Sequence, residues 1–183
     1  FWGFGVLGLT LFEIVILLNH NKLNDSEVKM KRLIIMQGHS GSGKSTLIDD
    51  LVQGTLKEKS IVLSTDNYFM EDGEYKFDES KLKRYHHKTW LECVNIMRNA
   101  YQYDDEGNLY KPFDWVEWIW LDNTNCKDED VKKYIEYADL YGYQVSFFRV
   151  DGDFESKAPS HIVKQQKEDL RKFNYLTKSE QLH

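Results

Sequence analysis

The stretch Gly38-His39-Ser40-Gly41-Ser42-Gly43-Lys44-Ser45-Thr46 decides the fold that this chain is expected to adopt. It matches the pattern G-x-x-x-x-G-K-[ST] at every fixed position. An apolar run, residues 33–36, precedes it, and apolar residues follow it at helical spacing, at positions 47, 48, 51 and 52. A strand, a glycine-rich loop and a helix in this order are the context that a phosphate-binding loop requires. The stretch therefore predicts such a loop, which we call the P-loop.

The residue types of the P-loop explain how it binds an anion. Glycines let the backbone turn back, so that successive N–H groups point at one phosphate group. The helix that begins there adds the positive end of its dipole. We expect residues 38–46 to bind ATP, with Lys44 reaching the β- and γ-phosphates. The Ser45 hydroxyl is expected to hold Mg²⁺.

The composition is that of one folded domain. The chain has 183 residues, of which 41% are hydrophobic and 14% are aromatic, enough to form a core. The net charge of −6 argues against a protein that coats nucleic acid generally, although a local basic patch can still bind a strand end. Cys93 and Cys126 are not spaced as metal ligands or as a redox pair, which favours a reducing compartment.

Residues 1–18 are nearly all apolar and allow two interpretations. The run is just long enough to span a membrane, and the basic residues after it would then place the rest of the chain in the cytoplasm. Alternatively, Met30 resembles the natural start of a P-loop protein, and residues 1–29 are upstream or non-native sequence. We divide the chain into an N-terminal extension (1–29), a P-loop domain (30–177) and a tail (178–183), and expect the domain in the cytoplasm.

Strand and helix patterns alternate along the rest of the chain. Runs rich in β-branched and aromatic residues predict strands at 31–37, 61–64, 115–121 and 143–150. Apolar residues at helical spacing predict helices after the P-loop, from about 80 to 101, from 128 to 141, and from Pro159 to about 173. This alternation predicts an α/β fold with a parallel sheet covered by helices on both faces.

Two carboxylates follow directly after predicted strands. Asp66 follows the strand at 61–64, in the polar cluster Thr65-Asp66-Asn67. Asp122 follows the strand at 115–121, as in the Walker-B arrangement, in which the carboxylate helps to hold Mg²⁺. Open α/β sheets place their ligand sites at the carboxyl ends of the strands. We therefore expect Ser45 and Asp122 to be the metal ligands and Asp66 to act on a substrate.

The most basic part of the chain, residues 81–88, also allows two interpretations. It lies in the first half of a predicted helix, and the simpler interpretation is that it forms a solvated helix face. The alternative is a patch that meets an anionic substrate near Asp66.

The chain resembles the P-loop kinases in several motifs that occur in a fixed order. After the P-loop come Ser64-Thr65-Asp66-Asn67-Tyr68-Phe69, Tyr75-Lys76-Phe77-Asp78, Asp122-Asn123-Thr124-Asn125 and, before the last predicted strand, Gly142-Tyr143. Over residues 31–173 the chain is most similar to the phage-type polynucleotide 5′-hydroxyl kinase domains and to related "AAA domain" ATP-binding proteins. The resemblance implies the fold of the P-loop-containing nucleoside triphosphate hydrolases, with ATP and Mg²⁺ as cofactors. It also implies transfer of the γ-phosphoryl group to a hydroxyl, with Asp66 activating a 5′-hydroxyl.

The chain departs from this family after the strand at 143–150. The family usually carries there a helical lid with an arginine that grips the phosphates. Here the link formed by residues 151–157 is short and acidic, and it contains no arginine. Arg149 is expected inside the strand and Arg171 late in the last helix, and a lysine lacks the bidentate fork of an arginine. Arg84, in the basic segment, is therefore our candidate for the catalytic arginine, and turnover is expected to be slow.

Three functions remain open at this stage. The first is an ATP- and Mg²⁺-dependent kinase that acts on a nucleic-acid 5′ end. The second is a kinase of the same fold that acts on the hydroxyl of a small molecule. The third is an ATP-binding module with little catalysis. Competition by oligonucleotides with salt-dependent affinity would distinguish the first from the second, and ATP binding without turnover would indicate the third.

Overall fold

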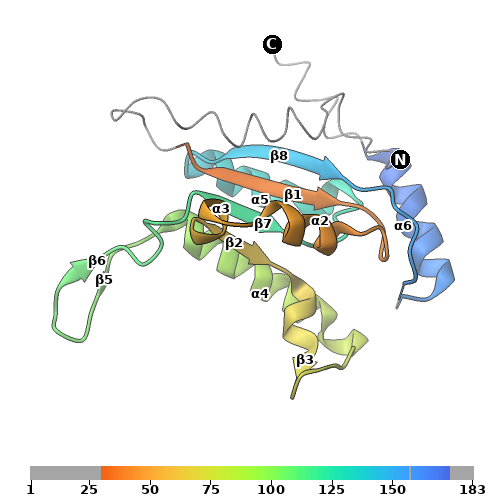
Figure 1. Ribbon diagram of the computed structural model, residues 1–183, viewed down its shortest axis with the longest axis horizontal. Coiled ribbons are helices and arrows are strands. Elements are labelled where there is room, and N and C mark those ends of the chain that lie inside the picture. Colours follow the sequence, from red (N-terminus) through yellow and green to blue (C-terminus); the bar gives the residue numbers. More distant parts are fainter. Residues whose placement is uncertain (1–29, 157, 174–183) are drawn as a thin grey trace, which may run out of the picture.

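A four-stranded parallel sheet forms the centre of the molecule. The computed structural model describes residues 30–156 and 158–173. The strands are β1 (Arg32–Gln37), β2 (Ser60–Leu63), β7 (Trp118–Leu121) and β8 (Gln144–Arg149), and their order across the sheet is β2-β7-β1-β8 (Figure 1). All three neighbouring pairs are parallel. The predicted α/β fold with a parallel sheet is confirmed.

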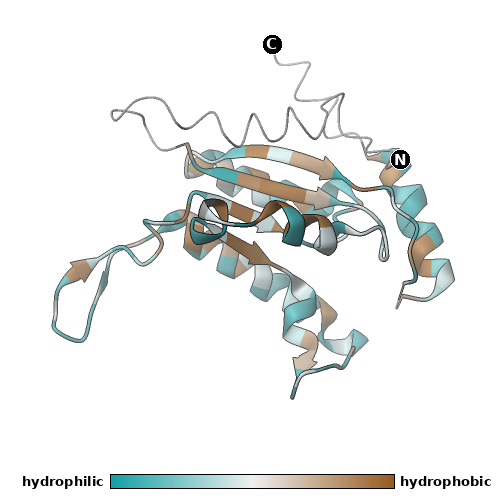
Figure 2. Cartoon of the chain, in the orientation of Figure 1, coloured by the Kyte–Doolittle hydropathy of each residue, from teal (hydrophilic) through white to brown (hydrophobic). Residues whose placement is uncertain are grey.

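Strand β1 lies between β7 and β8, and its last five residues are buried. Leu33 is opposite Ile119 on β7 and Val145 on β8, and this register continues along the three strands. A parallel strand that is covered on both faces is apolar throughout, because neither row of side chains reaches water. Figure 2 shows that the strands of the sheet are largely hydrophobic, whereas the helices carry both polar and apolar residues.

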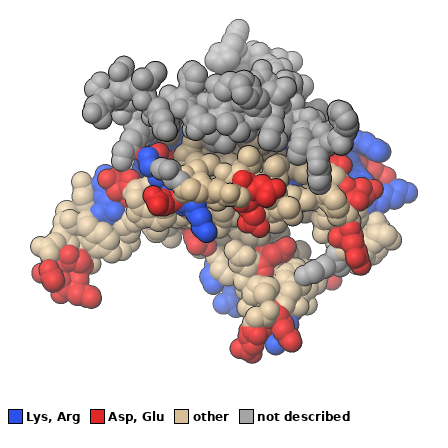
Figure 3. All heavy atoms as spheres, in the orientation of Figure 1, with Lys and Arg blue, Asp and Glu red and all other residues tan. Residues whose placement is uncertain are grey.

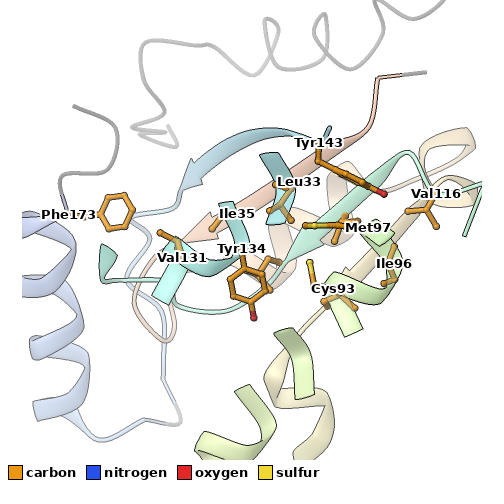
Figure 4. Packing of buried hydrophobic residues seen from close by; sticks show 14 residues of the cluster. Leu33, Ile35, Cys93, Ile96, Met97, Val116, Val131, Tyr134, Tyr143 and Phe173 are labelled. Atoms are coloured by element: carbon orange, nitrogen blue, oxygen red, sulfur yellow. The ribbon is translucent and has the colours of Figure 1, made fainter. Parts of the chain in front are cut away.

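Helices cover both faces of the sheet, as the sequence predicted. On one face, the side chains of α2 (Lys44–Leu51) and α3 (Thr55–Glu58) pack with Trp118 and Trp120. On the other, α4 (Glu79–Arg98) and α5 (Asp128–Leu140) pack against Leu33 and Ile35 (Figure 4). The last helix, α6 (Ser160–Lys172), follows β8 and ends before Phe173, which belongs to this second cluster.

Local signals set the ends of these helices. The Asp78 carboxylate accepts a hydrogen bond of 2.9 Å from the backbone N–H of Ser80 and thereby caps α4. Gly142 follows α5 with a φ of 72°, a left-handed conformation that favours glycine. Pro159 is the N-terminal cap of α6. Helix α3 was not predicted; it forms in the turn after Gly54.

Two short hairpins and a 3-10 helix project from the sheet. The 3-10 helix, η2 (Thr65–Phe69), leads into the hairpin of β3 (Met70–Glu71) and β4 (Glu74–Tyr75). The second hairpin, β5 (Gln102–Tyr103) and β6 (Leu109–Tyr110), extends away from the body of the molecule, and acidic side chains gather at its tip (Figures 1 and 3). The sequence analysis did not predict this pair of strands.

The predicted strand at 115–121 is too long by three residues. Strand β7 begins only at Trp118, because the backbone forms a turn in which the N–H of Val116 donates to the carbonyl of Phe113. Trp115 is consequently 48% exposed, and its indole N–H donates to the Pro112 carbonyl at 3.0 Å.

The N-terminal predictions stay untested. Residues 1–29 and 174–183 lie outside the described residues, and with them the apolar run at 1–18 and the predicted tail. Within residues 30–156 and 158–173, none of the helices combines the length and the hydrophobicity needed to cross a bilayer.

The core of the sheet gives a test of the fold. Replacement of Ile119 by Ala should lower the free energy of unfolding by about 2–5 kcal/mol, because the side chain is fully buried in β7 and its loss leaves a cavity. The matched control is Leu140→Ala at the end of α5, where the side chain is 69% exposed and the change should stay within about 0.5 kcal/mol. Urea unfolding curves measure both. Equal losses for the two variants would contradict the position of β7 in the centre of the sheet.

Candidate functional site

The carboxyl ends of the four parallel strands meet at one edge of the sheet. The P-loop follows β1, Asp66 follows β2, Asp122 follows β7, and residues 151–156 follow β8 (Figure 1). This edge is where an open α/β sheet binds ligands. The structure thus brings together three of the features that the sequence singled out, the P-loop, Asp66 and Asp122.

The P-loop wraps around its own lysine. The Lys44 ammonium donates hydrogen bonds of 2.9 Å to the Gly38 carbonyl and 3.0 Å to the His39 carbonyl, and the residue is only 8% exposed. Burial lowers the pKa of Lys44, and the carboxylates of Asp122 and Asp66 act in the opposite direction. The buried ammonium thus lies within the loop, where it can meet an anion.

The other P-loop residues form the wall around this ammonium. The Ser42 side chain is buried, and its hydroxyl lies 3.4 Å from Lys44 Nζ. The ring of His39 is buried too, with Nδ1 2.8 Å from the Ser40 carbonyl oxygen. Helix α2 begins directly after Gly43, which has a φ of 93°. The first turn of this helix exposes the two remaining predicted residues, Ser45 and Thr46.

Ser45 and Asp122, the two residues that the sequence predicts as metal ligands, contact each other. The Ser45 hydroxyl donates a 2.6 Å hydrogen bond to Asp122 Oδ2. Burial raises the pKa of the Asp122 carboxyl, while the bond from Ser45 and the charge of Lys44 lower it; Asp66 and Asp49 raise it further. Several carboxylates therefore share this edge. Hydroxyl and carboxylate oxygens are the donors that Mg²⁺ prefers, so the residues present fit this ion.

The turn after β7 holds the site together. The N–H of Gly38 donates to the Thr124 carbonyl at 3.1 Å, and the Asn125 amide donates to the Met36 carbonyl at 2.7 Å. On the other side, the Asn123 side-chain oxygen accepts a 2.9 Å hydrogen bond from the N–H of Thr65, the residue before Asp66. Residues 122–125 thus connect the base of the P-loop with the segment that carries Asp66. The sequence identified this motif but not its bonds.

Asp66 lies exposed on η2 and has a tyrosine partner. The Tyr75 hydroxyl, from strand β4, donates a 3.1 Å hydrogen bond to Asp66 Oδ1. Burial, together with the nearby Asp66 carboxylate, raises the pKa of Tyr75 to about 12, so Tyr75 remains a hydrogen-bond donor at neutral pH. The hydrogen bond orients the Asp66 carboxylate. Sequence reasoning quoted Tyr75 as part of a motif but assigned it no contact.

Aromatic side chains pack on η2, the segment that carries Asp66. Phe69 of η2 packs against Tyr75, Phe77 and Tyr85, with ring centroids 4.8–6.0 Å apart. The Tyr68 ring lies under the Lys88 ammonium, at 4.1 Å, and its hydroxyl is hydrogen-bonded to Glu92. These contacts fix η2 on α4 and place a cation of the basic segment next to the Asp66 loop.

The basic segment divides into paired and exposed residues. Lys81 contacts the carboxylates of Glu71 and Asp78 at 3.7 and 3.5 Å. Lys83 and Arg84 are exposed on the first half of α4. The prediction for Arg149 is confirmed: it lies in β8, where its guanidinium donates to the Gln37 side chain at 3.3 Å.

Residues 151–156, which we call the strap, lie against the P-loop. The N–H of Phe154 donates to the Gly41 carbonyl at 2.9 Å, and the hydroxyls of Ser156 and Ser40 are also 2.9 Å apart. From α6, the Gln166 side-chain oxygen accepts a 2.9 Å hydrogen bond from the N–H of Ser40. The sequence of the strap contains no arginine. Their contact with the P-loop has no signal in the sequence.

The fold and this edge of the sheet define a P-loop nucleotide-binding protein of the α/β class. Comparison with known proteins gives the family: the AAA domain family model matches residues 33–172, and the chain belongs to this family. Human NEDD4-binding protein 2 is 29% identical over 119 residues, which are 65% of this chain. The chain spans only 6% of that protein's length.

One solved structure supports the fold, and a second is reported for comparison only. A chain of the Pnkp1/Rnl/Hen1 RNA repair complex superposes with a TM-score of 0.55 at 14% identity, over 81% of this chain and 46% of that one. The APS kinase of Mycobacterium tuberculosis gives a TM-score of 0.44 at 16% identity, over 78% of this chain and 98% of that one.

The contribution of the Asn125 side chain to the free energy of unfolding can be measured. Asn125→Ala should lower the free energy of unfolding by about 2–3 kcal/mol, because the buried Met36 carbonyl loses its donor and Ala has to adopt a φ of 46°. Asn125→Gly removes the amide without the strain and should recover part of this loss. Asn95→Ala, at an exposed position of α4, is the matched control. The hypothesis fails if Asn125→Ala unfolds at the same urea concentration as the parent protein.

Proposed function

We propose that this chain is an ATP- and Mg²⁺-dependent phosphotransferase that transfers the γ-phosphoryl group to the 5′-hydroxyl end of a nucleic acid. The observation that carries the proposal is the 2.6 Å hydrogen bond between Ser45 of the P-loop and Asp122, with the Asp66 carboxylate exposed after the strand next to β7. This arrangement supports the binding of a metal–nucleotide complex and an acceptor at the same edge of the sheet.

The proposed mechanism assigns one task to each residue. The P-loop amides and Lys44 bind the β- and γ-phosphates, and Ser45 and Asp122 hold the metal. When bound, Mg²⁺ neutralises charge on the phosphate oxygens. Asp66 accepts the proton of the acceptor hydroxyl while that oxygen forms its bond to the γ-phosphorus. The bond between the γ-phosphorus and the bridging oxygen breaks, and ADP leaves.

Three observations favour a nucleic-acid acceptor over a small molecule. The motifs around Asp66 resemble those of the polynucleotide 5′-hydroxyl kinases. Lys83, Arg84 and Lys88 are exposed on α4, the helix that packs against the Asp66 segment. The Phe77 ring packs against Phe69 of the segment that carries Asp66 and is 56% exposed, so a nucleobase can stack on it.

The strap bears on one of the two alternative functions, the ATP-binding module. Its residues offer no arginine to the γ-phosphate, which supports slow turnover and, in the limit, an ATP-binding module. A small-molecule kinase uses the same P-loop and the same base. We place this activity in the cytoplasm; a membrane partner enters only if residues 1–18 insert in a bilayer.

The experiment is transfer of labelled γ-phosphate from ATP to a panel of acceptors. The panel holds 5′-hydroxyl RNA and DNA, the same oligonucleotides with a 5′-phosphate, and nucleosides. We expect Mg²⁺-dependent labelling of the 5′-hydroxyl oligonucleotides alone. Labelling of nucleosides but not of oligonucleotides would indicate a small-molecule kinase. ATP binding without labelling of any acceptor would contradict the proposed transfer.

Two substitutions separate binding from chemistry. Lys44→Ala should abolish ATP binding and transfer together, because it removes the charge that meets the β- and γ-phosphates. Asp66→Asn should bind ATP as the parent does and turn over about two to four orders of magnitude more slowly, the range for a lost general base. Asp105→Asn, at the exposed tip of the β5–β6 hairpin, is the control for loss of a carboxylate. Full transfer by Asp66→Asn would show that Asp66 is only a turn residue.

The source of the catalytic arginine is tested in the same assay. Arg84→Ala should reduce turnover more than Arg149→Ala, because the Arg149 guanidinium is engaged by Gln37 in the sheet. ATP affinity should stay within about two-fold of the parent, since the contact is made to charge that develops during transfer. Arg98→Ala, in the last turn of the same helix, is the matched control. Turnover that depends on Arg149 or Arg171 and not on Arg84 would place the arginine in the C-terminal segment.

A further inference from the structure

We propose that one face of the β5–β6 hairpin is a docking surface for a partner protein, which presents an extended segment rich in arginine and lysine. We call the surface formed by Tyr101, Tyr103 and Leu109 the hairpin face. The hairpin leads into the amino end of β7, whereas the P-loop and Asp66 lie at the carboxyl ends of the strands (Figure 1). The proposal therefore goes beyond phosphotransfer and does not depend on it.

Register and alternation place three exposed side chains on this face. Tyr103 lies directly opposite Leu109 in the antiparallel pair of β5 and β6. Tyr101 comes two residues before Tyr103, the spacing at which side chains of an extended chain share a face. The three side chains are between 53% and 74% exposed. Large, mostly apolar side chains that gather on a surface indicate an interaction site, which single exposed ones do not.

Hydrogen bonds fix the hairpin at its base and at its tip. At the base, the N–H of Phe113 donates to the Asn99 side-chain oxygen at 3.0 Å. At the tip, the Asp104 carboxylate accepts hydrogen bonds of 3.0 and 2.7 Å from the N–H groups of Glu106 and Asn108. A two-stranded hairpin gains little stability from its own strands, so these bonds keep its shape. A surface that is ordered before the partner arrives loses little entropy on binding.

The charge of the hairpin selects the partner. Residues 101–115 carry four carboxylates and one ammonium, which gives a net charge of −3. Asp105 and Glu106 are exposed at the tip, where acidic side chains gather (Figure 3). This charge repels the phosphates of a nucleic acid and attracts a basic segment.

The hairpin already contains one contact of the proposed kind. The Lys111 ammonium lies over the Tyr101 ring, 4.8 Å from its centroid. An arginine or lysine of the partner would make the same cation–π contact on Tyr103, the most exposed of the three side chains. A guanidinium also binds a carboxylate through two parallel hydrogen bonds. Because Asp104 follows Tyr103 directly, one extended segment can reach both the ring and the carboxylates of the tip.

The test measures the binding of a probe peptide to the full chain. The probe is a fluorescein-labelled peptide in which arginine alternates with threonine, and its control has glutamate in place of arginine. Fluorescence anisotropy should show binding of the arginine peptide alone, with an affinity that falls as salt is added. If the arginine peptide does not bind to the parent protein, the proposal is wrong.

Substitutions in the hairpin separate the ring from the charge. Tyr103→Ala should weaken peptide binding roughly three- to ten-fold, as expected for one lost cation–π contact. Tyr103→Phe keeps the ring and should bind like the parent. Glu106→Lys should weaken binding roughly two- to five-fold, because it removes one ion pair at the surface. Leu140→Ala, at an exposed position of α5, is the matched control. Unchanged affinity in Tyr103→Ala would overturn the proposal.

Amide signals locate the peptide on the protein. In ¹⁵N-labelled protein the peptide should shift the signals of residues 101–111 and leave those of residues 43–46 in place. Shifts spread over the acidic surface elsewhere would overturn the proposal, since the net charge of −6 would then explain the binding.

Two further outcomes would assign a different occupant and so overturn the proposal. A single-stranded oligonucleotide that binds the parent and is lost in Tyr103→Ala would show that the rings stack on bases. Self-association of the parent in sedimentation, abolished in Tyr103→Ala, would show that the occupant is a second copy of the chain. ATP binding by each variant reports its folding; if the parent itself binds no ATP, the proposed phosphotransfer fails and the docking surface is still decided by the peptide.

Discussion

The four-residue turn at 122–125 is the constraint on which the site depends. Its backbone and side chains hold Gly38 and Met36 of the first strand–loop unit on one side and Thr65 on the other. Asp122 in the same turn accepts the hydroxyl of Ser45. Gly38, Met36 and Thr65 are buried, so each bond that is lost leaves one of their backbone polar groups without its partner. The distance between the phosphate-binding loop and the segment that carries Asp66 is therefore set by one turn.

The parts of the site that the sequence could predict are those with a local signal. The P-loop, Asp66 and Asp122 each follow an apolar run, and in a parallel sheet such runs end at the same edge. The contact between Tyr75 and Asp66 could not be predicted in this way, because it depends on the register of a two-residue hairpin, β3–β4. The start of β7 was misplaced because Trp115 and Val116 look like strand residues, while a turn of the backbone excludes them. The strap contacts join residues more than a hundred positions apart, such as Ser40 and Ser156, and leave no pattern in the sequence.

Two groups of opposite charge lie at this edge of the sheet. Burial lowers the pKa of Lys44, which is buried, and raises the pKa of Asp122, which is half-buried. Each therefore has a cost of burial that a bound partner of opposite charge would offset. A metal–triphosphate complex supplies both partners, phosphate oxygens for Lys44 and a cation for Asp122. The strap contributes carboxylates and no arginine, so the proposed transfer would take its arginine from another segment, and our candidate is Arg84, which is exposed on α4.

The central claim is that one edge of the sheet binds the metal–nucleotide complex with Asp66 beside it. Paramagnetic broadening in ¹⁵N-labelled protein titrated with Mn²⁺–ATP tests this claim most directly, because the metal reports its own position. We predict that the amide signals of residues 43–46, Asp122 and Asp66 broaden first, while those of the β5–β6 hairpin stay sharp. Broadening centred on the hairpin or spread evenly over the chain would contradict the account, and so would broadening of the P-loop that spares Asp122 and Asp66.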